Sequence, residues 1–163
     1  MKREEDSIKP YRTFEDLEVY QAAREFRKAM YRVARRLPEV EKFGLTAHIR
    51  DAAVSLTNNI AEGHGRFHFL DQIKFMLTSR GSLEELLDDL NICLDENYLS
   101  AEEVETLKSD GWRVHKLING YIRFVRGRID SRSSRVQESP ADQVLSKEEL
   151  NDALFCRFNS STV

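Results

Sequence analysis

The stretch SLTNNIAEG, residues 55–63, followed by Arg66, decides the fold. It places two adjacent amides, a carboxylate and a glycine at the end of an apolar helical segment. Because Asn and Gly are poor residues for a helix interior, their presence indicates a positional role. We expect Gly63 to end the helix with a positive φ. Asn59 and Glu62 share one helical face and are expected to bond a neighbouring helix or a helix end. The pattern favours a structural polar corner, with a ligand or catalytic site as the alternative.

Four amphipathic helical segments extend outward from this corner. Apolar residues recur at spacings of three and four, which predicts helices at about 14–37, 45–62, 69–96 and 101–126. Thr13 is the expected N-cap of the first helix and Pro38 its stop. Ser100 and Glu103 form a capping box that opens the fourth. The segments between these helices are short, and four helices joined in this way predict an all-α, antiparallel up-down four-helix bundle.

One irregularity interrupts the third helix. Arg80 breaks its apolar series and is followed by Gly81. The break indicates either a close helix crossing or a buried polar contact, and the sequence alone leaves both open. The first and fourth helices also carry apolar residues outside their main stripes. We expect three of these, Leu17, Tyr20 and Trp112, to meet a neighbouring subunit.

Length and composition indicate one helix-rich domain with a tail. The chain has 163 residues, of which 33% are charged, 40% hydrophobic, and only three proline. We divide it into an arm at 1–12, a bundle at 13–128 and a polar tail at 129–163, in which 147–158 has the pattern of a short amphipathic helix. No apolar run approaches a membrane span, and the two cysteines lack metal spacing. We therefore expect a cytoplasmic protein with no disulfide, cofactor or membrane partner.

Basic residues form stripes on two helices although the formal net charge is −3. On the first helix, the stripe lies opposite the apolar face. Between Arg24 and Leu37 there are six basic residues and one acid. A solvated helix face explains such a stripe, and so does a surface that binds phosphates. The candidate nucleic-acid-binding residues are Arg24, Lys28, Arg32, Arg35 and Arg36 on the first helix, with Arg113, Lys116, Arg123 and Arg126 on the fourth.

Enzymatic alternatives find little support in the sequence. A di-metal carboxylate site in a bundle needs Glu-x-x-His motifs, and no histidine here has an acid three residues before it. His64 and His68 are four apart, but Gly65 between them indicates a turn. No glycine loop has the spacing of a phosphate-binding loop. Cys93 lies among apolar residues and is expected to be a buried thiol. We therefore predict a protein that is not an enzyme.

The order and spacing of four stretches give a more specific indication. The chain resembles the four-helix-bundle family of proteins encoded in intervening sequences of 23S rRNA genes, which includes the accessory variability determinants of diversity-generating retroelements. The NIAEG element followed by GSLEE is distinctive. The matching stretches are FEDLEVYQAA (14–23), LPEVEKFGL (37–45), IRDAAVSLTNNIAEGHGR (49–66) and SRGSLEELLDDL (79–90).

The resemblance implies a homopentameric ring. It also implies a non-enzymatic adaptor whose basic surface binds a reverse transcriptase and its RNA or DNA. The candidate residues of the structural motif are Asn59, Glu62, Gly63, Arg66 and Gly81. The slightly acidic balance and the tail depart from the strongly basic retroelement members. The alternative function is therefore an oligomeric protein-interaction scaffold that binds no nucleic acid.

Overall fold

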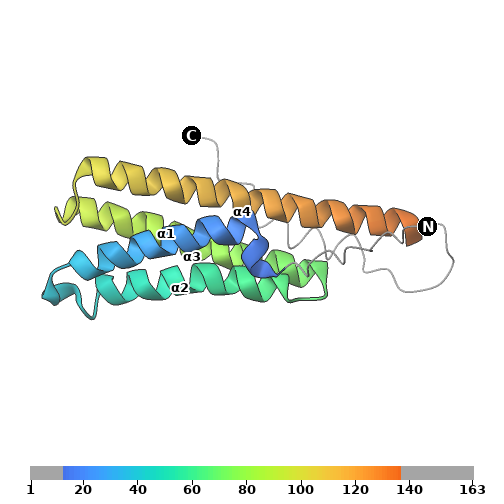
Figure 1. The fold of residues 1–163 in the computed structure, drawn as a ribbon, viewed down its shortest axis with the longest axis horizontal. Helices are drawn as coiled ribbons and strands as arrows, with labels where there is room; N and C mark the ends of the chain where they lie inside the picture. Colours follow the sequence, from blue (N-terminus) through green and yellow to red (C-terminus); the bar gives the residue numbers. More distant parts are fainter. Residues whose placement is uncertain (1–12, 137–163) are drawn as a thin grey trace, which may run out of the picture. The chain divides into compact units, whose positions relative to one another are not determined.

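Residues 13–136 of the chain are described by a computed structural model, in which all regular elements are helical (Figure 1). The second and third helices begin where the sequence predicts. The predicted arm at 1–12 and the amphipathic segment at 147–158 lie outside the described residues. The elements are η1 (Phe14–Asp16), α1 (Glu18–Arg36), η2 (Glu39–Glu41), α2 (Leu45–His64), α3 (Phe69–Asp95) and α4 (Ala101–Val136).

The start of the first helix differs from the prediction. Thr13 caps a separate 3-10 turn, η1, in which its backbone N–H donates to Asp16 Oδ2 over 2.9 Å and its Oγ1 accepts from the Glu15 N–H over 3.2 Å. These reciprocal bonds close one tight turn. Leu17 then takes an extended conformation, with φ −72° and ψ 126°, and α1 begins at Glu18. The single predicted helix is therefore two elements.

The end of the fourth helix was also predicted wrongly, since α4 continues to Val136. Ile129, just past the predicted end, is partly buried against the core. The Arg128 guanidinium lies 5.0 Å from the ring centroid of Phe69. Extending a helix costs far less than starting one, and no proline occurs between Arg126 and Pro140. The polar composition therefore does not end α4 at the boundary that the sequence suggested.

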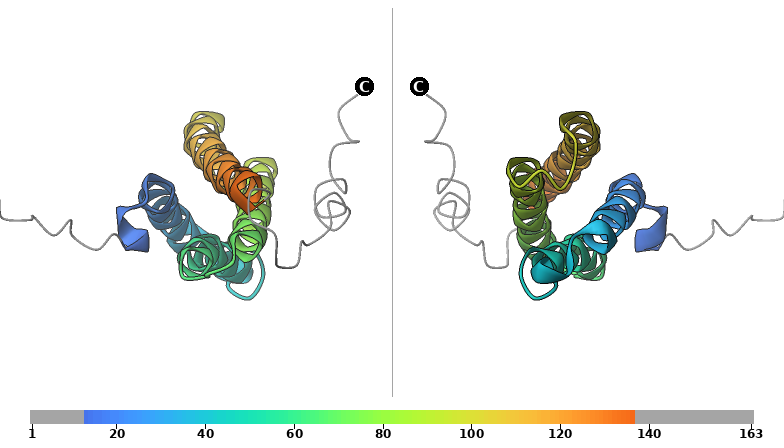
Figure 2. Two further views of the ribbon diagram at one scale, coloured as in Figure 1. Left: turned by 90° about the vertical axis from the view of Figure 1, so that its right-hand side faces the viewer. Right: turned by 90° about the vertical axis from the view of Figure 1, so that its left-hand side faces the viewer.

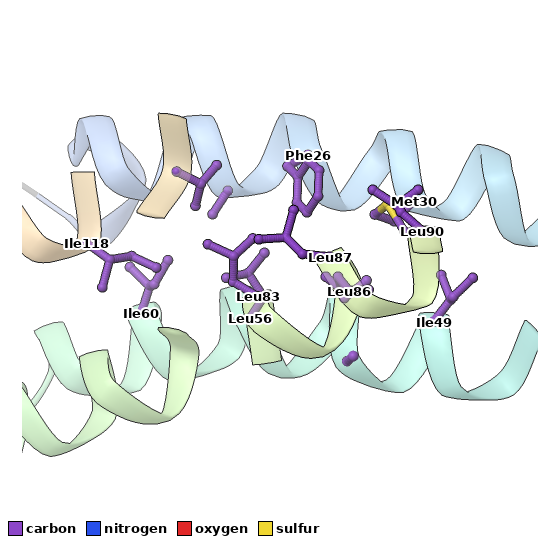
Figure 3. Close-up of a cluster of buried hydrophobic side chains, with 14 of the residues drawn as sticks. Phe26, Met30, Ile49, Leu56, Ile60, Leu83, Leu86, Leu87, Leu90 and Ile118 are labelled. Carbon is purple, nitrogen blue, oxygen red and sulfur yellow. The ribbon is translucent and has the colours of Figure 1, made fainter. Parts of the chain in front are cut away.

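The hydrophobic core lies between all four α-helices. Seen end-on, α1, α2, α3 and α4 follow one another around a common interior (Figure 2). Side chains from each helix point toward one another there, and burying each contributes roughly 1.5–3 kcal/mol (Figure 3). Those labelled are Phe26 and Met30 from α1, Ile49, Leu56 and Ile60 from α2, Leu83, Leu86, Leu87 and Leu90 from α3, and Ile118 from α4.

Gly63 does not have the left-handed conformation that the sequence suggested. It lies inside α2, and none of the described glycines has a positive φ. A Cβ added at Gly63 would lie 2.9 Å from Phe75 Cβ and 3.4 Å from the Gln72 carbonyl oxygen. Real Cβ atoms do not approach this closely. Glycine is therefore required because α2 and α3 nearly touch, and the helix ends later, at His64, with Gly65 as its C-cap.

Small polar residues continue this close approach along α2 and α3. The hydroxyls of Ser55 and Ser82 are hydrogen-bonded over 2.8 Å, and Ser79 Oγ donates to the Leu56 carbonyl over 2.7 Å. We call these four residues, with Gly63 and Phe75, the α2–α3 seam. Because hydrogen bonds are directional, these buried hydroxyls fix the position of α2 along α3 more narrowly than apolar packing alone would.

The polar residues of the corner bond mostly within their own segment. Asn59 Nδ2 donates to the Ser55 carbonyl over 2.7 Å, one turn back on α2, and not to a neighbouring helix as expected. Glu62 pairs with Arg66. The Arg66 guanidinium lies 4.8 Å from the ring centroid of Phe75. The backbone carbonyl of Arg66 accepts a hydrogen bond from Gln72 Nε2 over 2.7 Å. Arg66 thus fastens the turn to the first part of α3.

The break at Arg80 and Gly81 coincides with a polar contact. Arg80 Nη1 donates to Asn119 Oδ1 of α4 over 2.9 Å, in a partly buried position. A Cβ added at Gly81 would meet nothing within 4 Å, so no close helix crossing requires this glycine. The close approach of α4 lies elsewhere, at Gly111. A Cβ there would lie 2.7 Å from Leu87 Cδ2.

A histidine–aspartate pair joins α2 to α3. The two carboxylate oxygens of Asp89 lie 2.9 and 3.1 Å from His48 Nδ1, and the Asp89 side chain is 3% exposed against 56% for His48. Burial raises the pKa of the Asp89 carboxyl, and the hydrogen bond from His48 opposes that rise. The hydrogen bond to Asp89 raises the pKa of His48 above 6.5, helped by the charges of Glu85 and Asp51.

We expect Gly63→Ala to destabilise the protein by about 1 kcal/mol. Overpacking against the fixed Phe75 Cβ costs roughly 1–3 kcal/mol, which outweighs the gain of up to about 1 kcal/mol in helix propensity. Gly120→Ala is the matched control, because a Cβ there meets nothing within 4 Å and only the gain remains. Urea unfolding midpoints measure both. An equal rise of the unfolding midpoint in the two variants would contradict the close approach of α2 and α3 at Gly63.

The His48–Asp89 pair predicts a pH dependence of stability. A group whose pKa is raised by folding stabilises fully below its unfolded pKa, here about 6.5, and loses that contribution as the pH rises through the folded pKa. Stability should therefore fall on the alkaline side of pH 6.5. An NMR titration should give His48 a pKa above 6.5 that falls in Asp89→Asn. A folded value at or below 6.5 would refute the coupling.

Candidate nucleic-acid interface

The basic stripe of α1 faces solvent, and its members differ in their partners. Arg24, Arg32 and Arg35 are exposed and form no hydrogen bond or ion pair with another described residue. Lys28 Nζ pairs with Glu25 over 2.7 Å, and the hydrogen bond from Lys28 lowers the pKa of that carboxyl. Both side chains of the pair are largely exposed, so the lysine remains within reach of an anion.

A shallow groove of about 480 Å³ runs along this stripe. Its volume is comparable with the pockets that bind small molecules. We call it the basic groove, and no acidic side chain is among its described lining residues. Three of them, Arg27, Tyr31 and Val54, were not among the candidate site residues that the sequence gave. The lining residues are Arg27, Lys28, Tyr31, Arg32 and Arg35 of α1 with Val54 of α2.

Arg27 joins the two helices that line the basic groove, α1 and α2. Its Nη1 donates over 2.7 Å to Oγ1 of the buried Thr57, which itself donates to the Val54 carbonyl over 3.2 Å. The bond crosses between the two helices and fixes the rotation of α1 about its axis. The four-residue spacing of Arg27, Tyr31 and Arg35 places all three on one helical face. That spacing was visible in the sequence, but the partner on α2 was not.

Arg36, unlike Arg32 and Arg35, forms an ion pair with a described residue of another helix. Its Nη1 lies 2.7 Å from Glu103 Oε1, and the hydrogen bond from Arg36 lowers the pKa of Glu103. Glu103 is also the capping-box residue that accepts from Ser100, and its own backbone N–H donates to Ser100 Oγ over 3.2 Å. Arg36 therefore ties the end of α1 to the start of α4, a role that the sequence did not reveal.

Two of the four candidate basic residues of α4 lie along a second groove, of about 660 Å³. Arg113 and Lys116 line this α4 groove together with the half-exposed Trp112, but so does the acidic Glu105. Arg123 is exposed and Arg126 partly buried, and neither is among its lining residues. The two grooves share no lining residue among those described.

Other chemistry-bearing residues contribute no further site among those described. Cys93 is buried, as the sequence predicts, and burial raises the pKa of its thiol to about 11. Within residues 13–136, no three His, Cys, Asp or Glu side chains are grouped to hold a metal ion. No helix in this part of the chain combines the length and apolarity needed to cross a membrane.

Two of the three residues expected at a subunit interface are partly buried against the core of their own chain. Leu17 and Tyr20 lie against its own core, and the Tyr20 ring meets Phe14 edge-on with centroids 4.8 Å apart. Trp112 alone of the three stays exposed, at 47%. Larger exposed fractions occur where the sequence gave no signal, at Phe43 (90%) and Phe67 (98%), which lie in the connections before and after α2.

Comparison with known proteins gives a family and a fold. The family model described as 23S rRNA-intervening sequence protein matches residues 15–120. No curated protein matches the chain. Among solved structures, a protein of unknown function from the S23 ribosomal protein family of Bacteroides thetaiotaomicron is similar, with a TM-score of 0.60 and 21% identity over 64% of this chain and 95% of that one. This likeness shows the shared fold alone.

The ion pair between Arg36 and Glu103 predicts which arginine of α1 is structural. Arg36→Glu would set two carboxylates against each other and should lower the melting temperature. Arg35→Glu, its matched control, makes the same charge change at an exposed residue without an ion pair among the described residues, and should leave the melting temperature nearly unchanged. Equal melting temperatures for the two variants would show that the pair adds nothing.

Proposed function

The chain belongs to the family of 23S rRNA-intervening sequence proteins, and on this premise we propose that it is a non-enzymatic, oligomeric adaptor that binds nucleic acid through the basic groove of α1. The observation that carries the proposal is the composition of the groove. Four cationic side chains lie there, and two of them are arginines without a partner among the described residues. No acid is among the lining residues that the structure describes. Arginine is suited to bidentate contacts with phosphate oxygens.

Overall charge does not oppose this proposal. A chain of net charge −3 can bind anions through local clusters, because charges separated by more than about 8 Å are largely screened at physiological salt. The α4 groove is less suited to phosphate, since Glu105 lies on it beside Arg113 and Lys116. We therefore assign the main contact to α1 and a secondary share to the basic residues of α4.

The proposal includes the assembly. We infer an antiparallel bundle, since three short connections join the four helices, and a ring of five copies, which the family resemblance implies. A ring repeats each basic groove several times, so that weak phosphate contacts act together. The exposed Phe43, Phe67 and Trp112 offer apolar area for contacts with other copies or with a partner such as a reverse transcriptase.

The second candidate function is a protein-interaction scaffold without nucleic-acid binding. The same exposed aromatic side chains support it, because large exposed rings are typical of protein interfaces. In that case the basic groove would be only a solvated helix face. The two functions differ in one measurable property, which is whether the oligomer binds nucleic acid at low salt.

We expect the protein to bind RNA or DNA with an affinity that falls steeply as salt rises. Arg32→Glu with Arg35→Glu should weaken binding roughly tenfold or more and reduce the salt slope. Arg113→Glu with Lys116→Glu is the matched control, because it changes the net charge equally but on the α4 groove. Fluorescence anisotropy over a salt series measures both. No binding by the intact oligomer at low salt would favour the scaffold, and equal losses in the two double variants would remove the assignment to α1.

The assembly predicts a single species in solution. Light scattering coupled to size-exclusion chromatography should give a mass about five times the chain mass of 19.0 kDa. Salt should not dissociate it, because apolar contacts are not screened. A mass equal to that of one chain at micromolar concentration would contradict the ring and leave each basic groove to act alone.

A further inference from the structure

The basic groove contains two side chains that phosphate binding does not explain. Tyr31 lies between Arg27 and Arg35 on α1, and Val54 faces them from α2. Val54 is 38% exposed although α2 is otherwise largely buried along its apolar stripe. A groove that served phosphates alone would gain nothing from an aromatic ring and an exposed valine beside its arginines.

Tyr31 also has a free hydroxyl. The residue is partly buried against the core, and its hydroxyl forms no hydrogen bond with another described residue. Its ring is the one aromatic group among the described lining residues of the groove. One turn away in each direction is an arginine, and the bond from Arg27 to Thr57 fixes this part of α1 against α2. The ring is therefore held in place within a cationic wall.

These features match the chemistry of single-stranded nucleic acid. A positively charged groove follows the phosphates of a strand, while an aromatic ring stacks on a base, and such stacking is tolerant of sequence because every base has a π-face. A duplex hides its base faces inside the helix, so it would meet the arginines but could use neither Tyr31 nor Val54. The combination of arginines with the Tyr31 ring therefore favours a single strand over a duplex.

We propose that the basic groove selects single-stranded over double-stranded nucleic acid, with Tyr31 stacking on an unpaired base and Arg32 and Arg35 binding the flanking phosphates. This inference rests on the proposed function and names the form of nucleic acid that the site takes. Val54 provides the apolar contact on the opposite wall of the groove, whose volume is about 480 Å³.

The test compares an oligoadenylate RNA of about 12 nucleotides with a duplex of equal length, using the full chain and fluorescence anisotropy. The parent should bind the single strand more tightly. Tyr31→Leu keeps an apolar side chain against the core but removes the ring, and should weaken single-strand binding about 5- to 100-fold while leaving duplex binding unchanged. Tyr31→Phe should bind like the parent. Phe124→Leu, which removes an exposed ring that lines neither groove, should also bind like the parent.

Ultraviolet cross-linking of the parent provides a readout that needs no variant to fold. Mass spectrometry should find the bound oligoadenylate attached at Tyr31. Equal binding of single strand and duplex, unchanged in Tyr31→Leu, would overturn this inference while leaving the proposed function standing. A cross-link at Trp112 instead would also overturn it. Absence of binding to either probe would overturn the proposed function itself.

Discussion

The near contact between α2 and α3 is the constraint on which the rest of the structure depends. The helices approach until no Cβ fits at Gly63, and the hydroxyls of Ser55 and Ser82 bridge them over 2.8 Å. Because a cavity or an overpacked atom costs of the order of kcal/mol, the seam allows little adjustment. It holds α2 in place, and α2 in turn presents Thr57 to Arg27 of α1. The position of the basic groove thus follows from packing on the other side of α2.

The charge distribution separates arginines that build the fold from arginines that remain available. Arg36, Arg66 and Arg80 each bond a partner within the bundle, on Glu103, Glu62 and Asn119 respectively. Arg32 and Arg35 have no such partner among the described residues and lie in the basic groove. A count of basic residues along α1 treats Arg32, Arg35 and Arg36 alike.

Much of the fold was predictable, because it depends on local patterns. The apolar spacing placed α2 and α3 within two residues of their bounds, and the residue types at Ser100 and Glu103 identified the start of α4. Gly63 was recognised as important for the wrong reason. A glycine that gives room to another helix and one that takes a positive φ look the same in a sequence. Part of the candidate site could be read from the sequence, since helical spacing revealed the arginines of α1. The place of Val54 in the groove and the ion pair between Arg36 and Glu103 depend on contacts between distant segments, which the sequence does not show.

The central claim is that the unpartnered arginines of the basic groove are where nucleic acid binds. The most direct measurement is an NMR titration of the arginine side-chain Nε–H signals with a short single-stranded RNA at low salt. The signals of Arg32 and Arg35 should shift first and saturate together, while those of Arg36 and Arg80, already bonded within the bundle, should stay in place. Shifts confined to Arg113, or no shift at any arginine, would contradict the claim.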